Sequence, residues 1–490
     1  MNQSPNPMPI AWTIAGSDSG GVAGIQADLK TFHALGVHGC SAITAVTAQT
    51  PDQLSHIQFV SITAQLNAMK AMLAPDAIKI GMLGTRSLIS ELLTFLKSYR
   101  GHVILDPVLV TTSGGLLYET ALSEYARHLQ SCFPHVDLIT PNLHEARLLL
   151  NRKIETADDI KSAAENLLKQ GAKNILIKGG HATDDQLSQD YWTDGSSSFW
   201  LSHPRCTHCH FSGTGCTLSS AIAACLAIGF EMKEALVIAK MYVNQSMRLS
   251  KVHNRLCHTH WPQSFADLPM MSENPMSGIP PVFLECDKLG LYPIVDRATW
   301  LQRLLPLGIK HIQLRIKDLR GTDLEQEIKK AISIAKAQDA KLWINDYWEQ
   351  AIQFGAYGVH LGQTDLLNAD IAAMRNAKLR LGISTHSYAE VARAHAIRPS
   401  YIAFGPIFAT KSKVMPFQPQ GMARLKQWRR MLHYPLVAIG GIHVGNIDEV
   451  IKTGVDGIAL IAGITKMEDP IATTKILLSK LDDSRHADPA

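Results

Sequence analysis

The chain has 490 residues, 46% of them hydrophobic, and a formal net charge of +4. A chain of this length is usually too long to fold around a single hydrophobic core, so we expect at least two domains. The nearly balanced charge, without a basic stripe interleaved with aromatic residues, argues against a nucleic-acid-binding protein. No uncharged apolar run reaches the roughly 18 residues that would span a membrane. The 8 irregularly spaced cysteines fit no disulfide framework and the N-terminal sequence is unlike a signal peptide, so we expect a cytoplasmic protein.

Short apolar runs alternate with helical sequence over the first half of the chain. Strands are predicted at AWTIAG, SAITAVTA, AIKIGML, HVILDPV, VDLITPN and NILIKGG, followed by a hairpin at DYWTDGSSSFWL. Two helical sequences, GCTLSSAIAACLAIG and EALVIAKMYVNQSMRL, close this half. The alternation is typical of a doubly wound α/β sandwich, here with one antiparallel edge.

A proline-rich stretch of few charges, residues 257–283, separates this half from a second series of strands. These are LYPIVD, HIQLRIKD, LWINDY, YGVHLGQ, RLGISTH, YIAFGPIF, LVAIGG and GIALIAG, each followed by helical sequence. Eight such units predict a (β/α)₈ barrel with its site at the carboxyl ends of the strands. We therefore place the first domain at 1–262, a linker at 263–284 and the second domain at 285–490.

Glycines stand directly before an apolar helix in Ser212-Gly213-Thr214-Gly215-Cys216. Glycines at a helix N-terminus expose backbone N–H groups, which suits a phosphate. Cys216 would lie at the helix start, where the pKa of a thiol is usually lowered, so that its thiolate could act as a base. Taken alone, the sequence favours a tight turn with a small buried cysteine.

Other short motifs follow predicted strands of the first domain. The turn Gly16–Gly21 could bind phosphate, wrap a substrate or be a flexible turn. Asn142 and Glu145 share one helical face, which suits Mg²⁺ with its water shell or a simple helix cap. Lys178 ends a strand beside two glycines. The run Cys206–His210 lacks a second ligand pair, which argues against zinc.

These motifs, in order GSDSGGVAGIQADLKTF, AVTAQ, KIGML, LDPV, TPNLHEA, IKGGH and GTGCTLSSAIAA, resemble the hydroxymethylpyrimidine/phosphomethylpyrimidine kinases of the ribokinase-like superfamily over about residues 9–250. The resemblance implies ATP-dependent phosphorylation of a pyrimidine alcohol and then of its monophosphate. It also implies a ribokinase-like fold. This family usually has His before GTGC, whereas the chain has Ser212. We expect this difference to alter the loop slightly and not to abolish activity.

The resemblance assigns a role to each matching residue. Cys216, where many relatives carry Asp, would be the general base, with Gly213 and Gly215 as the anion hole and Lys178 beside the ATP phosphates. The pyrimidine would be bound by Gln49, Met82, Val108, Asp28 and Gly16. ATP and Mg²⁺ would be held by Asn142, Glu145 and Asp106.

Polar residues also mark the strand ends of the second domain. Gln313, Arg315 and Lys317 alternate along one strand and so share a face, as an amide and two cations suited to an oxyanion. Asn345-Asp346 ends the next strand and Asp365 follows the one after, so two carboxylates can converge on one Mg²⁺. Gly440-Gly441 and Ile461-Ala462 end the seventh and eighth strands, the recurring phosphate position of barrels.

QLRIKD, INDY, GVHLGQTDL, STHS, GPIFATKSK and AIGGI resemble thiamine phosphate synthase over about residues 288–480. The resemblance implies that a pyrimidine diphosphate and a thiazole phosphate are joined, with loss of diphosphate, through a dissociative step. Metal would be held by Asp346 and Asp365. Substrates would be bound by Gln313, Leu314, Arg315, Ile316, Lys317, Asn345, Ser384, Thr410, Lys411, Ser412, Lys413, Gly440, Gly441, Ile461 and Ala462. Relatives often have Ser where Ala462 stands, but its backbone N–H is kept.

Taken together, the two resemblances describe consecutive steps, because the first product would be the second substrate. One alternative is a sugar or pyridoxal kinase fused to an unrelated phosphate-binding barrel, against which Gln49 and Cys216 argue. Another is a ligand sensor without activity, against which the intact Cys216, Asp346, Asp365 and Lys413 argue. We expect Mg²⁺ and ATP as the required ions and co-substrate, small molecules as the only substrates, and a homo-oligomer.

Overall fold

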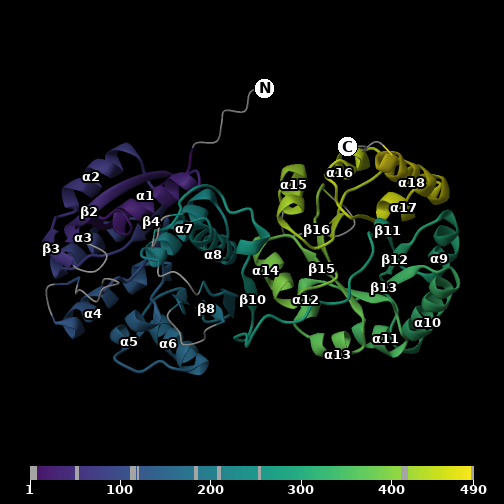
Figure 1. Cartoon of the computed structure of the whole chain (residues 1–490), viewed down its shortest axis with the longest axis horizontal. Helices are drawn as coiled ribbons and strands as arrows, with labels where there is room; N and C mark the ends of the chain where they lie inside the picture. The colour runs from purple at the N-terminus through teal and green to yellow at the C-terminus, as the bar shows by residue number, and fades with distance from the viewer. Residues whose placement is uncertain are drawn as a thin grey trace. The chain divides into compact units, whose positions relative to one another are not determined.

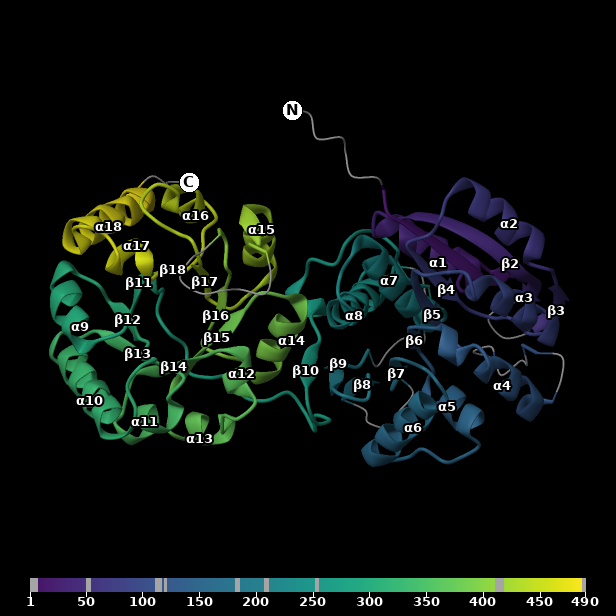
Figure 2. The same cartoon turned by 180° about the vertical axis from the view of Figure 1, so that it is seen from behind.

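The computed structural model describes residues 8–49, 54–110, 117–118, 121–180, 186–206, 211–251, 255–409 and 418–486. The chain divides into two compact units, Met1–Ile279 and Pro280–Ala490, each built on its own sheet (Figures 1 and 2). No helix within these described ranges is both long and apolar enough to cross a lipid bilayer.

A ten-stranded sheet runs through the first unit in the spatial order β10-β9-β8-β7-β6-β5-β4-β1-β2-β3. The strands are β1 (Ile10–Asp18), β2 (His38–Gln49), β3 (Leu54–Phe59), β4 (Ala77–Ile80), β5 (His102–Leu105), β6 (Leu138–Ile139), β7 (Ile175–Ile177), β8 (Leu187–Thr193), β9 (Ser198–Pro204) and β10 (Met270–Ser272). The strands from β2 through β1 and β4 to β7 are parallel, which confirms the predicted α/β sandwich. Both edges are antiparallel, however, because β3 pairs with β2 at one edge and β8 to β10 follow β7 at the other.

Strand β10 lies inside the stretch that we predicted as a linker. Met270 and Met271 pair with β9 and are buried. The prolines on either side of this short strand obscured it in the sequence, because proline usually marks a turn. The first part of the predicted linker thus belongs to the sheet of the first unit.

Helices pack on the sheet in two layers (Figure 1). One layer holds α1 (Gly24–Ala34), α7 (Thr214–Ile228) and α8 (Met232–Arg248), and the other holds α2 (Thr63–Met72), α3 (Arg86–Leu96), α4 (Leu122–Gln130), α5 (Leu143–Leu150) and α6 (Ala157–Lys169). Helix α7 packs against α1, α8 and the strands β1, β4 and β5. It is buried almost all round, and small residues such as Ala221, Ala223 and Ala224 allow these close approaches. This packing fixes the N-terminus of α7 at the carboxyl ends of the parallel strands.

Eight parallel strands close into a barrel in the second unit, with β18 paired to β11 (Figure 2). They are β11 (Gly290–Val295), β12 (His311–Leu314), β13 (Lys341–Asn345), β14 (Gly358–Leu361), β15 (Arg380–Thr385), β16 (Tyr401–Phe404), β17 (Leu436–Ile439) and β18 (Gly457–Leu460). The helices are α9 (Ala298–Leu304), α10 (Gly321–Ala337), α11 (Trp348–Gln353), α12 (Gln363–Leu366), α13 (Ile371–Asn376), α14 (Tyr388–Ile397), α15 (Gly421–Met431), α16 (Ile447–Ile451), α17 (Ala462–Thr465) and α18 (Pro470–His486). The predicted (β/α)₈ barrel is confirmed.

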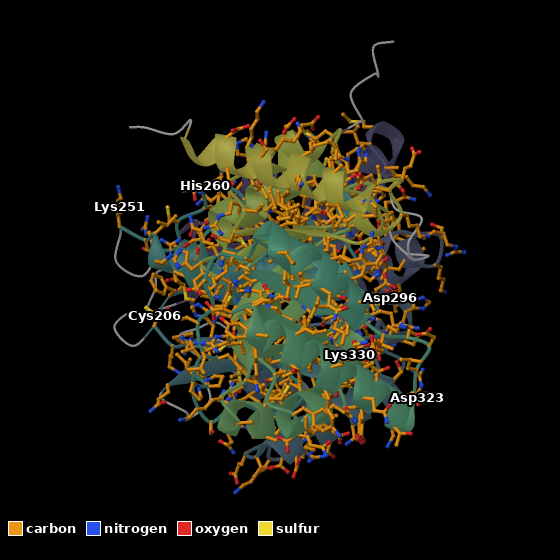
Figure 3. All side chains as sticks on the ribbon, turned by 90° about the vertical axis from the view of Figure 1, so that its right-hand side faces the viewer. Cys206, Lys251, His260, Asp296, Asp323 and Lys330 are labelled. Carbon is orange, nitrogen blue, oxygen red and sulfur yellow. The ribbon has the colours of Figure 1, made fainter. Side chains whose placement is uncertain are left out.

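Helix α10 shows why these segments form an outer ring. Leu324, Ile328 and Ala331 recur at helical spacing and are buried against the barrel. Asp323 and Lys330, labelled in Figure 3, lie on its exposed side. Such amphipathic helices cover the strands, so the polar groups at the strand ends are left to form the site.

Candidate active sites

The first candidate site centres on the N-terminus of α7. Gly213 caps this helix with a φ of 82°, and a Cβ atom there would lie 2.0 Å from the carbonyl oxygen of Val22. A side chain at Gly215 would begin 3.1 Å from Nζ of Lys178. The two glycines thus let the first turn of α7 approach its neighbours closely, with its free N–H groups next to a cation. This is the geometry expected of an anion hole.

Lys178, Asp106 and Glu145 form a buried charge cluster beside this helix. Nζ of Lys178 lies 2.6 Å from Asp106 and 3.9 Å from Glu145. Burial disfavours the charge on Asp106, but the two cations Lys178 and Lys79 hold its pKa below the usual value. Burial and the charge of Asp106 raise the pKa of Glu145 to about 7, although Lys178 opposes the rise. With one of its two carboxylates poised to take up a proton near neutral pH, the cluster is suited to a further cation.

Asn142 and Glu145 cap helix α5. The Asn142 side chain accepts a hydrogen bond from the Glu145 N–H at 2.8 Å, and the Glu145 carboxylate accepts one from the Asn142 N–H at 2.7 Å. The helix-cap interpretation of this pair is therefore realised in the structure. The same capping places the Glu145 carboxylate beside Lys178, where the kinase prediction needs it.

Cys216 lies in the first turn of α7, as predicted, but its pKa is not lowered. Burial, together with the charges of Asp28 and Asp106, raises the pKa of this thiol to about 11, although Lys79 and a hydrogen bond from the Gly24 N–H act in the opposite direction. The expectation of a lowered pKa was wrong because it counted the helix terminus and not the burial. Cys216 is a thiol at neutral pH in this structure.

Gly16 and Val108, two of the residues predicted to bind the pyrimidine, lie beside Met82. A Cβ atom at Gly16 would lie 3.1 Å from the sulfur of Met82, and Val108 packs against the same apolar cluster. Gln49 ends β2 and is half-buried. Its side-chain amide makes no hydrogen bond to any residue that the structure describes, and so remains available to a ligand.

Asp28 is bound by protein groups in this structure. It is fully buried and accepts hydrogen bonds from Lys79 at 2.8 Å, from Ser220 at 2.6 Å and from Thr13 at 2.6 Å. The family resemblance alone assigned this residue to the pyrimidine. In the structure its hydrogen bonds link β1, β4 and α7, and its contact with the pyrimidine stays a prediction.

We expect Lys79→Met to destabilise the first unit by about 3–5 kcal/mol, because it leaves the Asp28 carboxylate buried without its ion-pair partner. Urea unfolding of the full chain measures the loss as a lower midpoint for that unit. The double variant Asp28→Asn/Lys79→Met should recover most of the stability. A single variant as stable as the wild type would contradict this account.

The second candidate site lies at the carboxyl ends of the barrel strands. Gln313 is buried in β12 and donates a hydrogen bond to Asn345 at 2.7 Å. Nζ of Lys317 lies 2.5 Å from Asp346. Arg315, which lies between Gln313 and Lys317 in the sequence, is half-buried. Gln313 in β12 and Lys317, which follows this strand, therefore each contact a residue at the end of β13. This arrangement can bind an anionic group next to the two aspartates.

Leu314 and Ile316 alternate with these residues and are buried, each only 1% exposed. Their side chains belong to the opposite face of the strand, because successive side chains point to opposite sides. Their predicted contact with a substrate is therefore restricted to backbone groups. The correction follows from the same alternation that identified Gln313, Arg315 and Lys317.

Asp346 and Asp365 face each other across two strand ends. Burial, the charge of Asp346 and a hydrogen bond shared with Asp346 raise the pKa of Asp365. Asp346 adopts a left-handed backbone with φ of 66°, which is unusual for a residue other than glycine. Two carboxylates held this close fit a divalent cation between them. Among the described residues, no third His, Cys, Asp or Glu joins them in a metal-binding group.

A chain of hydrogen bonds that the sequence analysis missed runs from the barrel core to Ser384. His360 lies 2.7 Å from the Ser384 hydroxyl through Nε2 and 2.7 Å from the Tyr401 hydroxyl through Nδ1. Tyr401 is in turn 3.0 Å from the Tyr292 hydroxyl. Burial lowers the pKa of His360 to about 4, so its ring is neutral. A histidine within the apolar run GVHL was the available signal.

Glycines line the predicted position of the second phosphate. Gly440 and Gly441 follow β17 with φ of 97° and 68°, and Ile461 and Ala462 begin α17 after β18. A Cβ atom at Gly463 would lie 2.6 Å from the carbonyl oxygen of Ile442, so the two loops are in contact. Thr410, Lys411, Ser412 and Lys413 fall outside the described residues.

Comparison with known proteins finds relatives for both units. The family model for phosphomethylpyrimidine kinase matches residues 18–262, and that for thiamine monophosphate synthase matches residues 291–464. A probable thiamine biosynthetic bifunctional enzyme of Oryza sativa subsp. japonica is 33% identical, over 98% of this chain and 90% of its own. A thiamine-phosphate synthase of Serratia proteamaculans is 50% identical, over 40% of this chain and 92% of its own. The solved pyridoxal kinase of Staphylococcus aureus with AMP-PCP covers 52% of this chain and 95% of its own, at 31% identity and a TM-score of 0.47. The chain belongs to the family of bifunctional thiamine biosynthetic enzymes.

Proposed function

We propose that the first unit phosphorylates 4-amino-5-hydroxymethyl-2-methylpyrimidine twice with ATP, and that the second unit joins the resulting diphosphate to a thiazole phosphate. The products are thiamine phosphate and diphosphate. The observation that carries the proposal is the match of one chain, along 98% of its length, to a bifunctional thiamine biosynthetic enzyme. Each unit contributes a site of the required chemistry. A homo-oligomer and a cytoplasmic location remain predictions from the sequence.

In the kinase reaction the hydroxyl oxygen of the pyrimidine attacks the γ-phosphorus of ATP while the bond to the ADP oxygen breaks. The thiolate form of Cys216 would accept the hydroxyl proton, and the N–H groups at Gly213 and Gly215 would bind the transferring phosphoryl group. Lys178 would stabilise its negative charge. Phosphoryl transfer depends chiefly on such positioning and charge stabilisation. Asp106, Asn142 and Glu145 would hold Mg²⁺ with ATP, and that ion would neutralise phosphate charge.

In the synthase reaction the bond between the pyrimidine methylene and the diphosphate oxygen breaks first, and the diphosphate keeps the electron pair. The thiazole nitrogen then donates its lone pair to the methylene carbon, so no proton is transferred. Gln313, Arg315 and Lys317 would bind the leaving diphosphate. Asp346 and Asp365 would hold Mg²⁺, which supplies positive charge to that group when bound.

A coupled assay tests the whole proposal. The purified chain is incubated with the hydroxymethylpyrimidine, ATP, Mg²⁺ and the thiazole phosphate, and thiamine phosphate is measured by chromatography. We expect thiamine phosphate to accumulate only when all four are present. A parallel reaction with pyridoxal in place of the pyrimidine tests the alternative kinase substrate. Consumption of ATP with pyridoxal but not with the pyrimidine would overturn the assignment of the first unit.

A further inference from the structure

A buried ion pair that the kinase site does not include joins strand β8 to helix α8. Asp190 on β8 and Lys240 on α8 are only 3% and 7% exposed, and Nζ of Lys240 lies 2.7 Å from Oδ2 of Asp190. Lys240 also donates a hydrogen bond to the Ser188 hydroxyl at 3.3 Å. Removing two charges from water costs about as much free energy as their attraction returns, so such a pair adds little stability by itself. Its other contacts therefore indicate what it does.

The second oxygen of Asp190 binds the backbone next to Lys178. Oδ1 accepts a buried hydrogen bond from the N–H of Gly179 at 2.9 Å. The pairing of β7 with β8 reaches only to Ile177 (Figure 2), and a buried N–H beyond that point needs another acceptor. The Asp190 carboxylate supplies this acceptor at the residue that follows Lys178.

The backbone of Lys178 and Gly179 is held from two sides. A Cβ atom at Gly179 would lie 1.9 Å from the carbonyl oxygen of Gln189, so this residue lies directly against β8. The N–H of Lys178 donates a hydrogen bond at 2.8 Å to the carbonyl oxygen of Pro141, which follows β6. Nζ of Lys178 lies 2.6 Å from Asp106. The place of this ammonium group thus depends on how its backbone is held between the end of β6 and β8.

We propose that Asp190 is a positioning residue of the kinase site, which fixes Gly179 so that the ammonium group of Lys178 stays at the N-terminus of α7. Lys240 holds Asp190 in turn, from a helix that packs along α7. A displacement of about 1 Å in a charge-stabilising group can lower a rate roughly 10²-fold. The consequence for phosphoryl transfer rests on the proposed function of the first unit, whereas the hydrogen bond to Gly179 does not.

Two double variants separate the hydrogen bond to Gly179 from the ion pair. Both carry Lys240→Met, so that neither leaves an unpaired cation in the interior. Asp190→Asn keeps an oxygen that can accept from the Gly179 N–H, whereas Asp190→Ala removes it. Where chains with Lys240→Met fail to fold, the same two substitutions are made together with Lys240→Gln, which keeps a polar side chain beside Ser188.

Hydrogen exchange of the full chain tests the proposal without any substrate. Exchange in the peptide that spans residues 175–180 is followed by mass spectrometry under native conditions. We expect the Gly179 amide to exchange roughly tenfold faster in Asp190→Ala/Lys240→Met, because its N–H loses the acceptor. In Asp190→Asn/Lys240→Met it should exchange at the wild-type rate.

Kinetics with the pyrimidine and ATP test the consequence for catalysis. We expect Asp190→Ala/Lys240→Met to lower kcat roughly 10- to 100-fold and to change KM for ATP far less. The reason is that Lys178 would act on the charge of the transferring phosphoryl group, so its displacement affects the transition state most. Asp190→Asn/Lys240→Met should keep most of the wild-type kcat.

Arg248 and Asp267 offer a matched control, because Arg248 also lies on α8. Its guanidinium donates hydrogen bonds at 2.8 and 2.7 Å to the buried carboxylate of Asp267. Asp267→Ala/Arg248→Met should leave both the exchange of residues 175–180 and kcat at their wild-type values.

The proposal is overturned if this control, or the variant that keeps the amide oxygen, shows the same effects as Asp190→Ala/Lys240→Met. A folded Asp190→Ala/Lys240→Met chain with wild-type exchange or wild-type kcat would overturn it as well. Faster exchange in this variant, when even the wild-type chain never phosphorylates the pyrimidine, would instead overturn the proposed kinase function alone.

Discussion

Replacing Asp346 with asparagine is expected to lower kcat/KM of the condensation roughly 10³-fold, while the first unit continues to phosphorylate the pyrimidine. Asp346 contributes to the site in two ways. Its carboxylate pairs with Lys317 at 2.5 Å, and its charge helps to raise the pKa of Asp365. An amide keeps the shape but removes one negative charge from the predicted metal site. The leaving diphosphate then loses the charge that stabilises it as the bond breaks.

The coupled assay measures this effect directly, because the pyrimidine diphosphate made by the first unit should accumulate in place of thiamine phosphate. Asp448→Asn is a suitable control, since Asp448 is an aspartate of the same unit that pairs with Lys480 on the barrel exterior. Thiamine phosphate made at the wild-type rate by Asp346→Asn would contradict the metal-binding role. Loss of ATP consumption as well would show that the substitution damaged the first unit.

The barrel could be predicted from the sequence because its eight apolar strands and their polar ends repeat at regular intervals. The strand residues Gln313 and Lys317 were found for the same reason, since alternation in a strand assigns each side chain a face. The network of His360, Tyr401 and Tyr292 could not be found in this way. Its members lie on three different strands, and each one alone looks like an ordinary core residue.

The first site shows where sequence reasoning fails on electrostatics. Asp28 and Asp106 are both buried aspartates of the first unit, but Asp28 is paired with Lys79 inside the fold whereas Asp106 pairs with Lys178 beside α7. Only the packing of α7 on the sheet separates these roles. The prediction of a lowered pKa for Cys216 was wrong for a similar reason. The pKa rises because the folded chain buries the thiol, which the local sequence does not reveal. Short edge strands such as β10 were missed because proline masks their pattern.

Removal of the Cys216 thiol is expected to lower kcat of the kinase reaction by roughly 10²–10⁴-fold, the range typical for loss of a general base.

The raised pKa of Cys216 also leads us to expect that the kinase rate depends on pH. Because burial raises the pKa of this thiol to about 11, only a small fraction is thiolate at neutral pH. That fraction grows about tenfold for each pH unit below the pKa. The kinase kcat/KM should therefore rise steeply from pH 7 to pH 9 and fall as the pH is lowered.

The variant Cys216→Asp separates the base from the rest of the site. A carboxylate is already deprotonated over this range, since the ordinary pKa of aspartate is about 3.9. We expect this variant to retain activity and to lose the alkaline rise, whereas Cys216→Ala loses activity at every pH. Cys206→Ala, at an exposed cysteine of the same unit, should match the wild type. A Cys216→Ala variant that keeps both its rate and the alkaline rise would show that another group accepts the proton, because the sulfur would then have no part in it.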